Sequence, residues 1–259
     1  MKVLDLFSGI GGFSLAAEWM GWETVAFVER DTFCQKVLRK NFGQDIDIYN
    51  DITTFSGKPF RGQVGIVTGG FPCQPYSQAG LRKGTDDDRH LWPEMLRVIR
   101  EVQPRFVVGE NVLGLLNWNG GLVFDAVQSD LEIEGYEVIP FLLPACAVNS
   151  PQLRNRIWFI AYNDKVEQES VGIGRTENKQ QRETQIGRED WKLFDLVGDG
   201  TVFANWRNTR RTDHTESVFC RNGDGVSGWM DRLDALGNAV VPQIAYEIFR
   251  AIEATDAPN

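Results

Sequence analysis

The strongest constraint on the fold is an alternation, over the first 161 residues, of short β-branched apolar runs with segments of helical periodicity. This alternation is typical of a sheet of parallel strands connected by helices. The predicted strands are residues 3–7, 23–28, 45–49, 64–68, 105–109, 137–143 and 156–161. The predicted helices are residues 15–20, 32–41, 91–102, 122–131 and 240–252. Seven strands in one chain predict a doubly wound α/β sheet.

Length and composition limit what the chain can be. Its 259 residues suffice for one α/β domain, with or without a small appendage. The cysteines form no C-x-x-C pair, so neither a zinc site nor a disulfide framework is indicated, and no metal is expected. They are Cys34, Cys73, Cys146 and Cys220. No uncharged apolar run reaches about 18 residues, so we expect a cytoplasmic protein with no membrane contact.

The chain divides into three predicted regions, residues 1–162, 163–230 and 231–259. The alternating pattern ends near residue 162, and the next thirty or so residues resemble a surface insertion or a solvated linker. Aromatics interleaved with arginines then return, a composition that suits either stacking on bases or packing of a small subdomain. The net charge of −9 counts against a nucleic-acid partner, but residues 152–211 hold 11 Lys and Arg against 9 Asp and Glu, which permits a local basic face.

A glycine-rich turn follows the first predicted strand. The segment from Asp5 to Gly12 reads D-L-F-S-G-I-G-G, and such a turn lets the backbone approach a nucleoside-bearing ligand closely. Glu29 ends the second predicted strand, where a carboxylate can accept hydrogen bonds from both ribose hydroxyls. Asp51 follows the third and suits the exocyclic amine of a purine. Each signal is weak alone, but together they favour an adenosine-type ligand.

A cysteine between prolines follows the fourth predicted strand. The run Pro72-Cys73-Gln74-Pro75 would present the thiol on stiffened backbone, although a buried structural cysteine is the alternative. Glu110, just after the fifth predicted strand, is expected at the same sheet edge, so that nucleophile and acid flank one substrate. A helix-capping or solvent-facing acid is its alternative.

The segment Q-L-R-N-R places Gln152, Arg154 and Arg156 on one side of an extended stretch. Three polar side chains on one side can hold a planar polar group. An edge strand with solvated arginines would have the same sequence pattern, so the segment alone does not decide between the two.

Taken in order, these segments resemble the motifs of the DNA (cytosine-5)-methyltransferases of bacteria and their phages. The segments are Asp5 to Gly12, Glu29, Asp51, Pro72-Cys73, Glu110 to Val112, Gln152 to Arg156 and Gly237 to Pro242. The resemblance implies a class I S-adenosylmethionine-dependent methyltransferase fold, a Rossmann-like, doubly wound and mostly parallel seven-stranded sheet. It also implies a target-recognition region at residues 163–230, which is short for the family.

The resemblance implies S-adenosylmethionine as the methyl donor. Glu29 would hold the ribose, Asp51 and Ile52 the adenine, and Asn238 would return from the C-terminal part to complete the pocket. The implied donor-binding residues are Phe7, Gly9, Ile10, Gly11, Gly12, Glu29, Asp51, Ile52, Pro72, Asn238 and Ala239.

The resemblance further implies methylation of cytosine at carbon 5 through a covalent adduct. Cys73 would attack carbon 6, and a protonated Glu110 would hydrogen-bond the adjacent ring nitrogen. Arg154 and Arg156 would hold the ring carbonyl. Double-stranded DNA is the implied substrate, with its target base flipped out. The residues assigned to DNA are Gln74, Ser77, Arg82, Lys83, Arg89 and Gln152. A monomer is expected, and a cognate restriction endonuclease stays open as a partner.

Three other functions compete with this reading. A nicotinamide-dependent oxidoreductase shares the strand, glycine turn and acid, but its third glycine would lie elsewhere and it needs no Pro72-Cys73 pair. A non-catalytic relative would have no need of Cys73, Glu110 and Arg156 together. An RNA methyltransferase of the same chemistry stays open.

Overall fold

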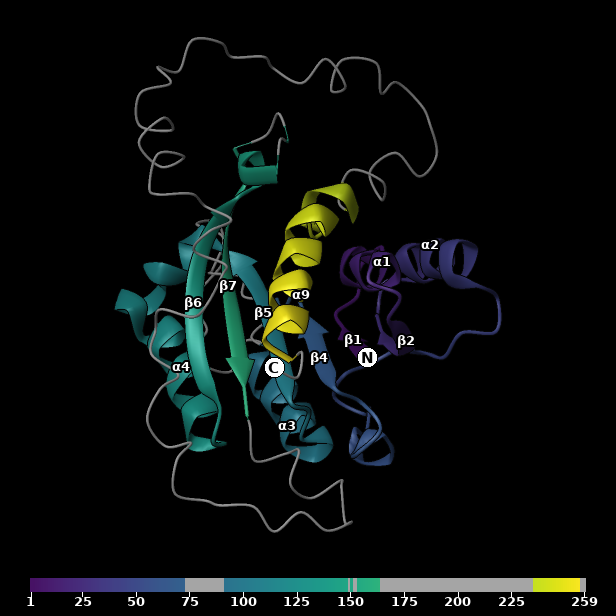
Figure 1. The fold of residues 1–259 in the computed structure, drawn as a ribbon, viewed down its shortest axis with the longest axis horizontal. Coiled ribbons are helices and arrows are strands. Elements are labelled where there is room, and N and C mark those ends of the chain that lie inside the picture. The colour runs from purple at the N-terminus through teal and green to yellow at the C-terminus, as the bar shows by residue number, and fades with distance from the viewer. Residues whose placement is uncertain (73–90, 149, 151–152, 164–234, 257–259) are drawn as a thin grey trace, which may run out of the picture.

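The computed structural model describes residues 1–72, 91–148, 150, 153–163 and 235–256 (Figure 1). Seven strands form one sheet in the order β3-β2-β1-β4-β5-β7-β6. They are β1 (Lys2–Leu6), β2 (Glu23–Val28), β3 (Ile48–Tyr49), β4 (Ile66–Gly69), β5 (Phe106–Val112), β6 (Glu137–Pro144) and β7 (Asn155–Tyr162). All neighbours are parallel except β7, which is antiparallel to both β5 and β6. This topology confirms the predicted doubly wound, mostly parallel seven-stranded sheet.

Helices cover both faces of the sheet (Figure 1). The helices are α1 (Gly12–Trp19), α2 (Thr32–Phe42), α3 (Trp92–Val102), α4 (Leu122–Ile133) and α9 (Pro242–Asp256), with short 3-10 turns η1 (Lys58–Phe60), η2 (Leu113–Leu116), η3 (Trp118–Gly121) and η4 (Ala145–Val148). Val3 and Ile66 belong to the core under α1 and α9, whereas Leu4 and Val67 belong to the core under α3 and α4. Successive strand residues therefore fill opposite cores, as the pleat requires.

Helix α9 brings the C-terminal part of the chain onto the N-terminal half of the sheet. The Phe249 ring lies 6.4 Å from Phe13 and 5.0 Å from Trp22, centroid to centroid. The indole N–H of Trp22 also donates to Glu253 Oε1 at 3.3 Å. Residues 164–234 lie outside the described residues, so the predicted boundaries near 163 and 231 stay predictions.

Two predicted elements differ from the structure near the sheet edge that matters below. The fifth strand was expected to end at residue 109, but β5 continues to Val112, so Glu110 lies within the strand. The reason is β7, whose antiparallel ladder pairs Glu110 with Trp158 and Val112 with Arg156, beyond the end of the parallel ladder with β4. The third strand is shorter than expected, since only Ile48 and Tyr49 pair with β2.

The remaining boundaries differ by a few residues. Helix α9 begins at Pro242 instead of residue 240, consistent with the preference of proline for the first helical position, where no N–H is needed. None of the helices in the described part of the chain is long and apolar enough to cross a membrane.

Candidate active site

The turn between β1 and α1 has the backbone conformation that glycine favours. Phe7, Gly9 and Gly11 have φ angles of 51°, 54° and 87°, in the left-handed region. A Cβ on Gly9 would meet no atom within 4 Å, so this backbone faces open space, and the neighbouring Ile10 is half-buried. A Cβ on Gly11 would instead lie 2.9 Å from Leu38 Cδ2. The turn is thus open on one side and tightly backed on the other.

Gly12 is where the C-terminal part of the chain meets this turn. A Cβ there would lie 2.7 Å from the carbonyl oxygen of Val240, so only a glycine admits so close an approach. Asn238 and Ala239 immediately precede Val240, and Asn238 is exposed whereas Ala239 is half-buried. The structure therefore brings the segment that carries Asn238 and Ala239 to the glycine turn, with the contact made by Val240.

Glu29 lies at the end of β2 beside the open face of the turn. Its Oε2 accepts a hydrogen bond from the Gly9 N–H at 2.7 Å, and its Oε1 accepts one from the Asp31 N–H at 2.6 Å. Burial raises the pKa of Glu29 above its ordinary value, against the opposing effect of these hydrogen bonds. Two backbone donors therefore fix the carboxylate in place next to Gly9.

Asp51 begins the loop after β3. Its Oδ1 accepts hydrogen bonds from the N–H and the hydroxyl of Thr53 at 2.9 and 2.8 Å. The Thr53 hydrogen bonds hold the pKa of Asp51 below its ordinary value, so it is an ionised acceptor at neutral pH. Ile52 is buried, which anchors the loop in the core under α3.

The Glu110 carboxylate forms an ion pair with Arg156 at the edge of the sheet where the parallel strands end. Glu110 Oε1 lies 2.9 Å from Arg156 Nε, and the two side chains are 9% and 19% exposed. Burial raises the pKa of Glu110 to about 7, although Arg156 and Arg154 lower it. A carboxyl with this pKa can gain or lose a proton near neutral pH, as a general acid requires.

The backbone that leads to Cys73 passes beside this carboxyl. A Cβ on Gly70 would lie 3.5 Å from Glu110 Oε2. Pro72 is half-buried, and its carbonyl accepts a hydrogen bond from the Leu91 N–H at 3.5 Å. Residues 73–90 lie outside the described residues, and Cys73, Gln74, Ser77, Arg82, Lys83 and Arg89 are among them, as is Gln152 further along the chain.

Arg154 contacts the C-terminal part of the chain instead of Glu110. Its Nη2 donates to the Ala239 carbonyl at 2.6 Å and its Nη1 to the Leu236 carbonyl at 3.5 Å. Its Nε is buried with no hydrogen-bond partner among the described residues. Burial and the nearby Arg156 both lower the pKa of Arg154, so the two arginines are close to one another, but they make different contacts.

Two buried polar residues received no role from sequence reasoning. Asn111 Nδ2 donates to the Phe71 carbonyl at 2.8 Å, which fixes the backbone two residues before Cys73. Asp5 accepts hydrogen bonds from the hydroxyls of Ser14 and Thr68 at 2.7 and 2.9 Å, and burial raises its pKa to about 7. The available signal was a polar side chain in or beside an apolar strand, but its partner is set only by tertiary contacts.

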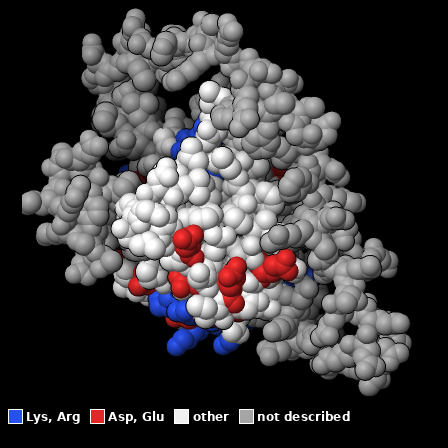
Figure 2. Space-filling model, turned by 90° about the vertical axis from the view of Figure 1, so that its left-hand side faces the viewer, with Lys and Arg blue, Asp and Glu red and all other residues white. Residues whose placement is uncertain are grey.

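The described surface gives little indication of a nucleic-acid groove on the side that carries β6 and α4. Figure 2 shows this side to be mainly uncharged, with acidic side chains gathered toward its lower end beside a group of basic ones. Among the described residues, this view shows no broad basic surface. The cations assigned to DNA, Arg82, Lys83 and Arg89, lie outside the described residues.

Residues 1–221 match the sequence profile of the C-5 cytosine-specific DNA methylases. The chain belongs to this family. The match extends from the glycine turn through the Glu110 and Arg156 strands, so the residues that form the site are part of it. Membership confirms the resemblance drawn from the ordered motifs and excludes the nicotinamide-dependent reading.

Bacterial Type II methyltransferases are among the relatives of this methylase-family chain. It is 35% identical over 161 residues to the Type II methyltransferase M.Eco47II of Escherichia coli. The aligned segment covers 61% of this chain and 39% of the relative. It is 34% identical over 165 residues to the Type II methyltransferase M.HhaI of Haemophilus parahaemolyticus. That alignment covers 63% of this chain and 50% of the relative. The chain therefore spans about half, or less, of the length of these relatives.

A solved structure supports the fold. The Dnmt2 methyltransferase of S. pombe superposes with a TM-score of 0.62 over 99% of this chain and 100% of that one, at 20% identity. At this identity the likeness establishes the shared fold alone.

Proposed function

We propose that the chain is a DNA (cytosine-5)-methyltransferase that acts through a covalent Cys73 adduct. The observation that carries the proposal is the pair of buried Glu110 and half-buried Arg156, 2.9 Å apart, with Glu110 beside the backbone that leads to Cys73. A protonated acid can donate a hydrogen bond to a ring nitrogen, and a neighbouring cation can donate one to an adjacent ring carbonyl. Cytosine presents these groups side by side, as its N3 and O2.

The residues around the glycine turn fit S-adenosylmethionine as the methyl donor. Gly9 has open space over its backbone, and the fixed Glu29 carboxylate adjoins it. Glu29 would bind the ribose, Asp51 and Ile52 the adenine, and Asn238 would complete the pocket. When bound, this group supplies a methyl carbon made electrophilic by a positively charged sulfur.

Carbon 5 of cytosine is a weak nucleophile within an aromatic ring. Addition of the Cys73 thiolate to carbon 6 forms a C–S bond and moves the ring electrons toward carbon 5, which becomes enamine-like. A free thiol has a pKa near ~8.5, so Cys73 needs neighbouring positive charge to reach the thiolate form. Loss of the proton from carbon 5 of the methylated adduct then expels the thiolate and restores the aromatic ring.

Glu110 has the role of stabilising this adduct. A protonated Glu110 donates to N3 of the ring as negative charge develops there, and burial, which raises its pKa to about 7, supports that role. In the structure, Arg156 Nε contacts Glu110 Oε1. On arrival of the base, the Arg156 guanidinium would turn to the ring carbonyl, which leaves Glu110 free to keep a proton.

Arg154 has a supporting role in this proposal. Its hydrogen bond to the Ala239 carbonyl holds the residue after Asn238, so that Arg154 connects the base pocket to the donor pocket. Double-stranded DNA as the substrate, a cognate restriction endonuclease as a partner, a monomeric state and a cytoplasmic location stay predictions. The assigned DNA contacts also stay predictions; they are Gln74, Ser77, Arg82, Lys83, Arg89 and Gln152.

Expression in a host that lacks cytosine methylation, followed by bisulfite sequencing, tests the proposal. We expect cytosines in one fixed sequence context to resist conversion, and Cys73→Ala to abolish this protection while leaving S-adenosylhomocysteine binding intact. A folded chain that binds S-adenosylhomocysteine but leaves all DNA cytosines convertible would contradict the proposal. Total RNA from the same cells, sequenced in parallel, would reveal the RNA alternative.

A further inference from the structure

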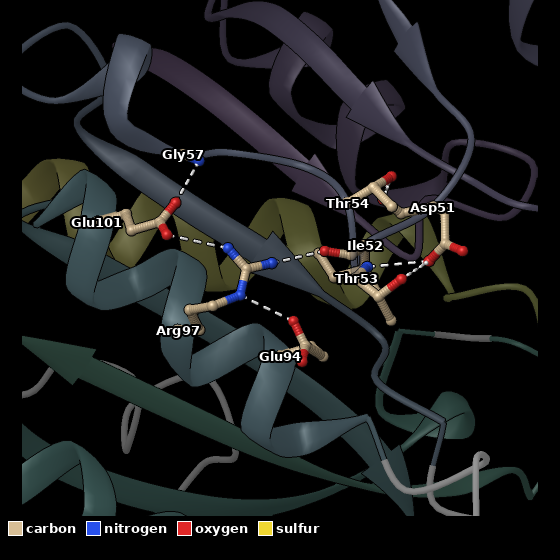
Figure 3. A network of polar contacts seen from close by, with 8 residues as sticks. All are labelled: Asp51, Ile52, Thr53, Thr54, Gly57, Glu94, Arg97 and Glu101. Carbon is tan, nitrogen blue, oxygen red and sulfur yellow. Dashed lines mark hydrogen bonds and ion pairs between the residues drawn. The ribbon is translucent and has the colours of Figure 1, made fainter.

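Arg97 of α3 is held by three partners on three sides. Its Nε lies 2.8 Å from Glu94 Oε2 and its Nη1 3.0 Å from Glu101 Oε1, both on the same helix. Its Nη2 donates to the carbonyl oxygen of Ile52 at 2.6 Å, across to the loop after β3 (Figure 3). The two glutamates thus orient the guanidinium, and its remaining nitrogen, Nη2, donates to the loop backbone. A planar group with donors in fixed directions suits this arrangement, and a lysine could not reproduce it.

A second set of contacts fixes the same loop to α3. Glu101 Oε2 accepts a hydrogen bond from the Gly57 N–H at 2.6 Å, so Glu101 links Arg97 to the far end of the loop (Figure 3). A Cβ on Gly57 would lie 2.8 Å from Val102 Cγ2 and 3.2 Å from the Val98 carbonyl. The loop backbone therefore packs directly on the helix at Gly57 and is hydrogen-bonded to it at Ile52.

The part of the loop that these contacts hold is the part that carries the predicted adenine contacts. Ile52 is buried. In the neighbouring Asp51, one carboxylate oxygen accepts a hydrogen bond from the Thr53 N–H. In Figure 3 the other Asp51 oxygen points away from the network. The N–H of Phe55 donates to the Asp51 carbonyl at 3.0 Å, which closes the loop into a compact turn. Shifting the Ile52 carbonyl would therefore move Asp51 with it.

We propose that Arg97 is a positioning residue for the purine end of the methyl donor. By fixing the Ile52 carbonyl to α3, it sets the Asp51 carboxylate where that group accepts a hydrogen bond from the exocyclic amine of adenine. This inference rests on the proposed function, because it takes the site around Gly9 and Glu29 to be the donor pocket. It adds a residue outside the pocket that determines how well the pocket distinguishes one purine from another.

Helix α3 also reaches the other half of the site. The Leu91 N–H, at the N-terminal end of the helix, donates to the Pro72 carbonyl at 3.5 Å. Met95 lies under the end of β4, because a Cβ on Gly69 would be 3.1 Å from Met95 Cε. Arg97 connects α3 to the loop after β3. The same helix therefore also contacts the segment that leads to Cys73.

The test compares two ligands on matched variants by calorimetry. S-adenosylhomocysteine carries the exocyclic amine, and S-inosylhomocysteine carries an oxygen in its place. Arg97→Met keeps the aliphatic stem and removes the donors, and we expect it to weaken S-adenosylhomocysteine binding by about ten- to a hundredfold, the range for losing a charged hydrogen bond. The preference for the adenosyl over the inosyl ligand should fall together with this affinity. Compared with Arg97→Met, Arg97→Lys should show a partial recovery of the affinity and of the preference.

Arg100→Met is the matched control. Arg100 lies on the same helix and pairs with Glu134 at 2.6 Å, so its variant loses an ion pair of α3 without touching the loop. It should bind both ligands as the unmodified chain does. Gly57→Ala perturbs the same loop independently, since its Cβ would displace the loop from Val102, and it should lower the ligand preference even if Arg97→Met fails to fold.

The outcomes separate the two proposals. An unmodified chain that binds neither ligand would contradict the proposed function. An unmodified chain that prefers the adenosyl ligand, together with Arg97→Met and Gly57→Ala variants of unchanged affinity and preference, would overturn the role of Arg97. Equal losses in Arg97→Met and Arg100→Met would also overturn it, because they would indicate a general effect on the helix.

Discussion

Glu110 and Arg156 are diagonal neighbours on adjacent antiparallel strands, and their side chains meet 2.9 Å apart on one face of the sheet. The register sets this contact, because Glu110 pairs with Trp158 and Val112 with Arg156, so both side chains point to the same side. Burial leaves little water to compete for either group. The register of β5 and β7 therefore sets an acid and a cation side by side at this edge of the sheet.

Glu110→Gln should lower the single-turnover rate of methyl transfer by roughly two to four orders of magnitude, the usual contribution of a positioned general acid. The amide keeps a donor but has no proton to exchange. Binding of S-adenosylhomocysteine should be unchanged, because among the described residues no atom lies within 4 Å of a Cβ on Gly9, and the Glu29 carboxylate is held by the N–H groups of Gly9 and Asp31. A variant as fast as the unmodified chain would remove Glu110 from the mechanism.

The pH dependence of the same variant gives a second measurement. The pKa of Glu110 is raised to about 7 by burial, so the free protein holds the proton below that pH and loses it above. The contribution of the acid to kcat/KM is thus complete at low pH and falls as pH rises through about 7. Relative to Glu110→Gln, the advantage of the unmodified chain should shrink over this interval, and a constant ratio from pH 6 to 9 would count against the assignment.

Arg156 and Arg154 should differ in what their removal affects. Arg156→Ala leaves Glu110 buried without its partner and removes a donor to the base, so we expect methyl transfer to fall by about a hundred- to a thousandfold with donor affinity unchanged. Arg154→Ala frees the Ala239 carbonyl, so it should weaken S-adenosylhomocysteine binding. Calorimetry and single-turnover rates measure the two effects, and identical profiles for both variants would contradict this division.

Gly9 and Gly12 should likewise separate ligand binding from stability. Gly9→Ala meets no protein atom, so beyond backbone strain of about 1 kcal/mol it should mainly obstruct the donor, with an affinity loss of about tenfold or more. Gly12→Ala would bring a Cβ to 2.7 Å from the Val240 carbonyl and should lower the free energy of unfolding by about 1–3 kcal/mol. Chemical denaturation and calorimetry test both, and a Gly9→Ala variant with full affinity would move the donor site elsewhere.

The fold was predictable because its signals are local. Each parallel strand is a short apolar run and each helix has its own periodicity, so the order of elements follows from the sequence. The end of β5 was not predictable in this way, because its extension to Val112 depends on pairing with β7, which begins more than forty residues later. Strand lengths at a sheet edge are set by partners distant in the chain.

The site was partly predictable for the same reason. The even spacing of Arg154 and Arg156 predicted a shared side of an extended segment, but β7 begins at Asn155. The contacts of Arg154 with Leu236 and Ala239 depend on the return of the C-terminal part. Asn111 and Arg97 act on backbone carbonyls, Phe71 and Ile52, that carry no side-chain signal. Residues that position others are therefore found from contacts and not from patterns.

The most direct test of the central claim is covalent trapping on DNA that contains 5-fluorocytosine. Plasmid DNA amplified with the fluorinated nucleotide presents every sequence context, and fluorine at carbon 5 blocks the proton loss that would release the enzyme. With S-adenosylmethionine present, we expect intact mass spectrometry after nuclease digestion to detect the chain joined to a methylated fluorocytosine nucleotide, with the modification on Cys73 and no adduct in Cys73→Ala. A chain that methylates ordinary DNA but forms no adduct with the fluorinated DNA, or an adduct on a residue other than Cys73, would contradict the account.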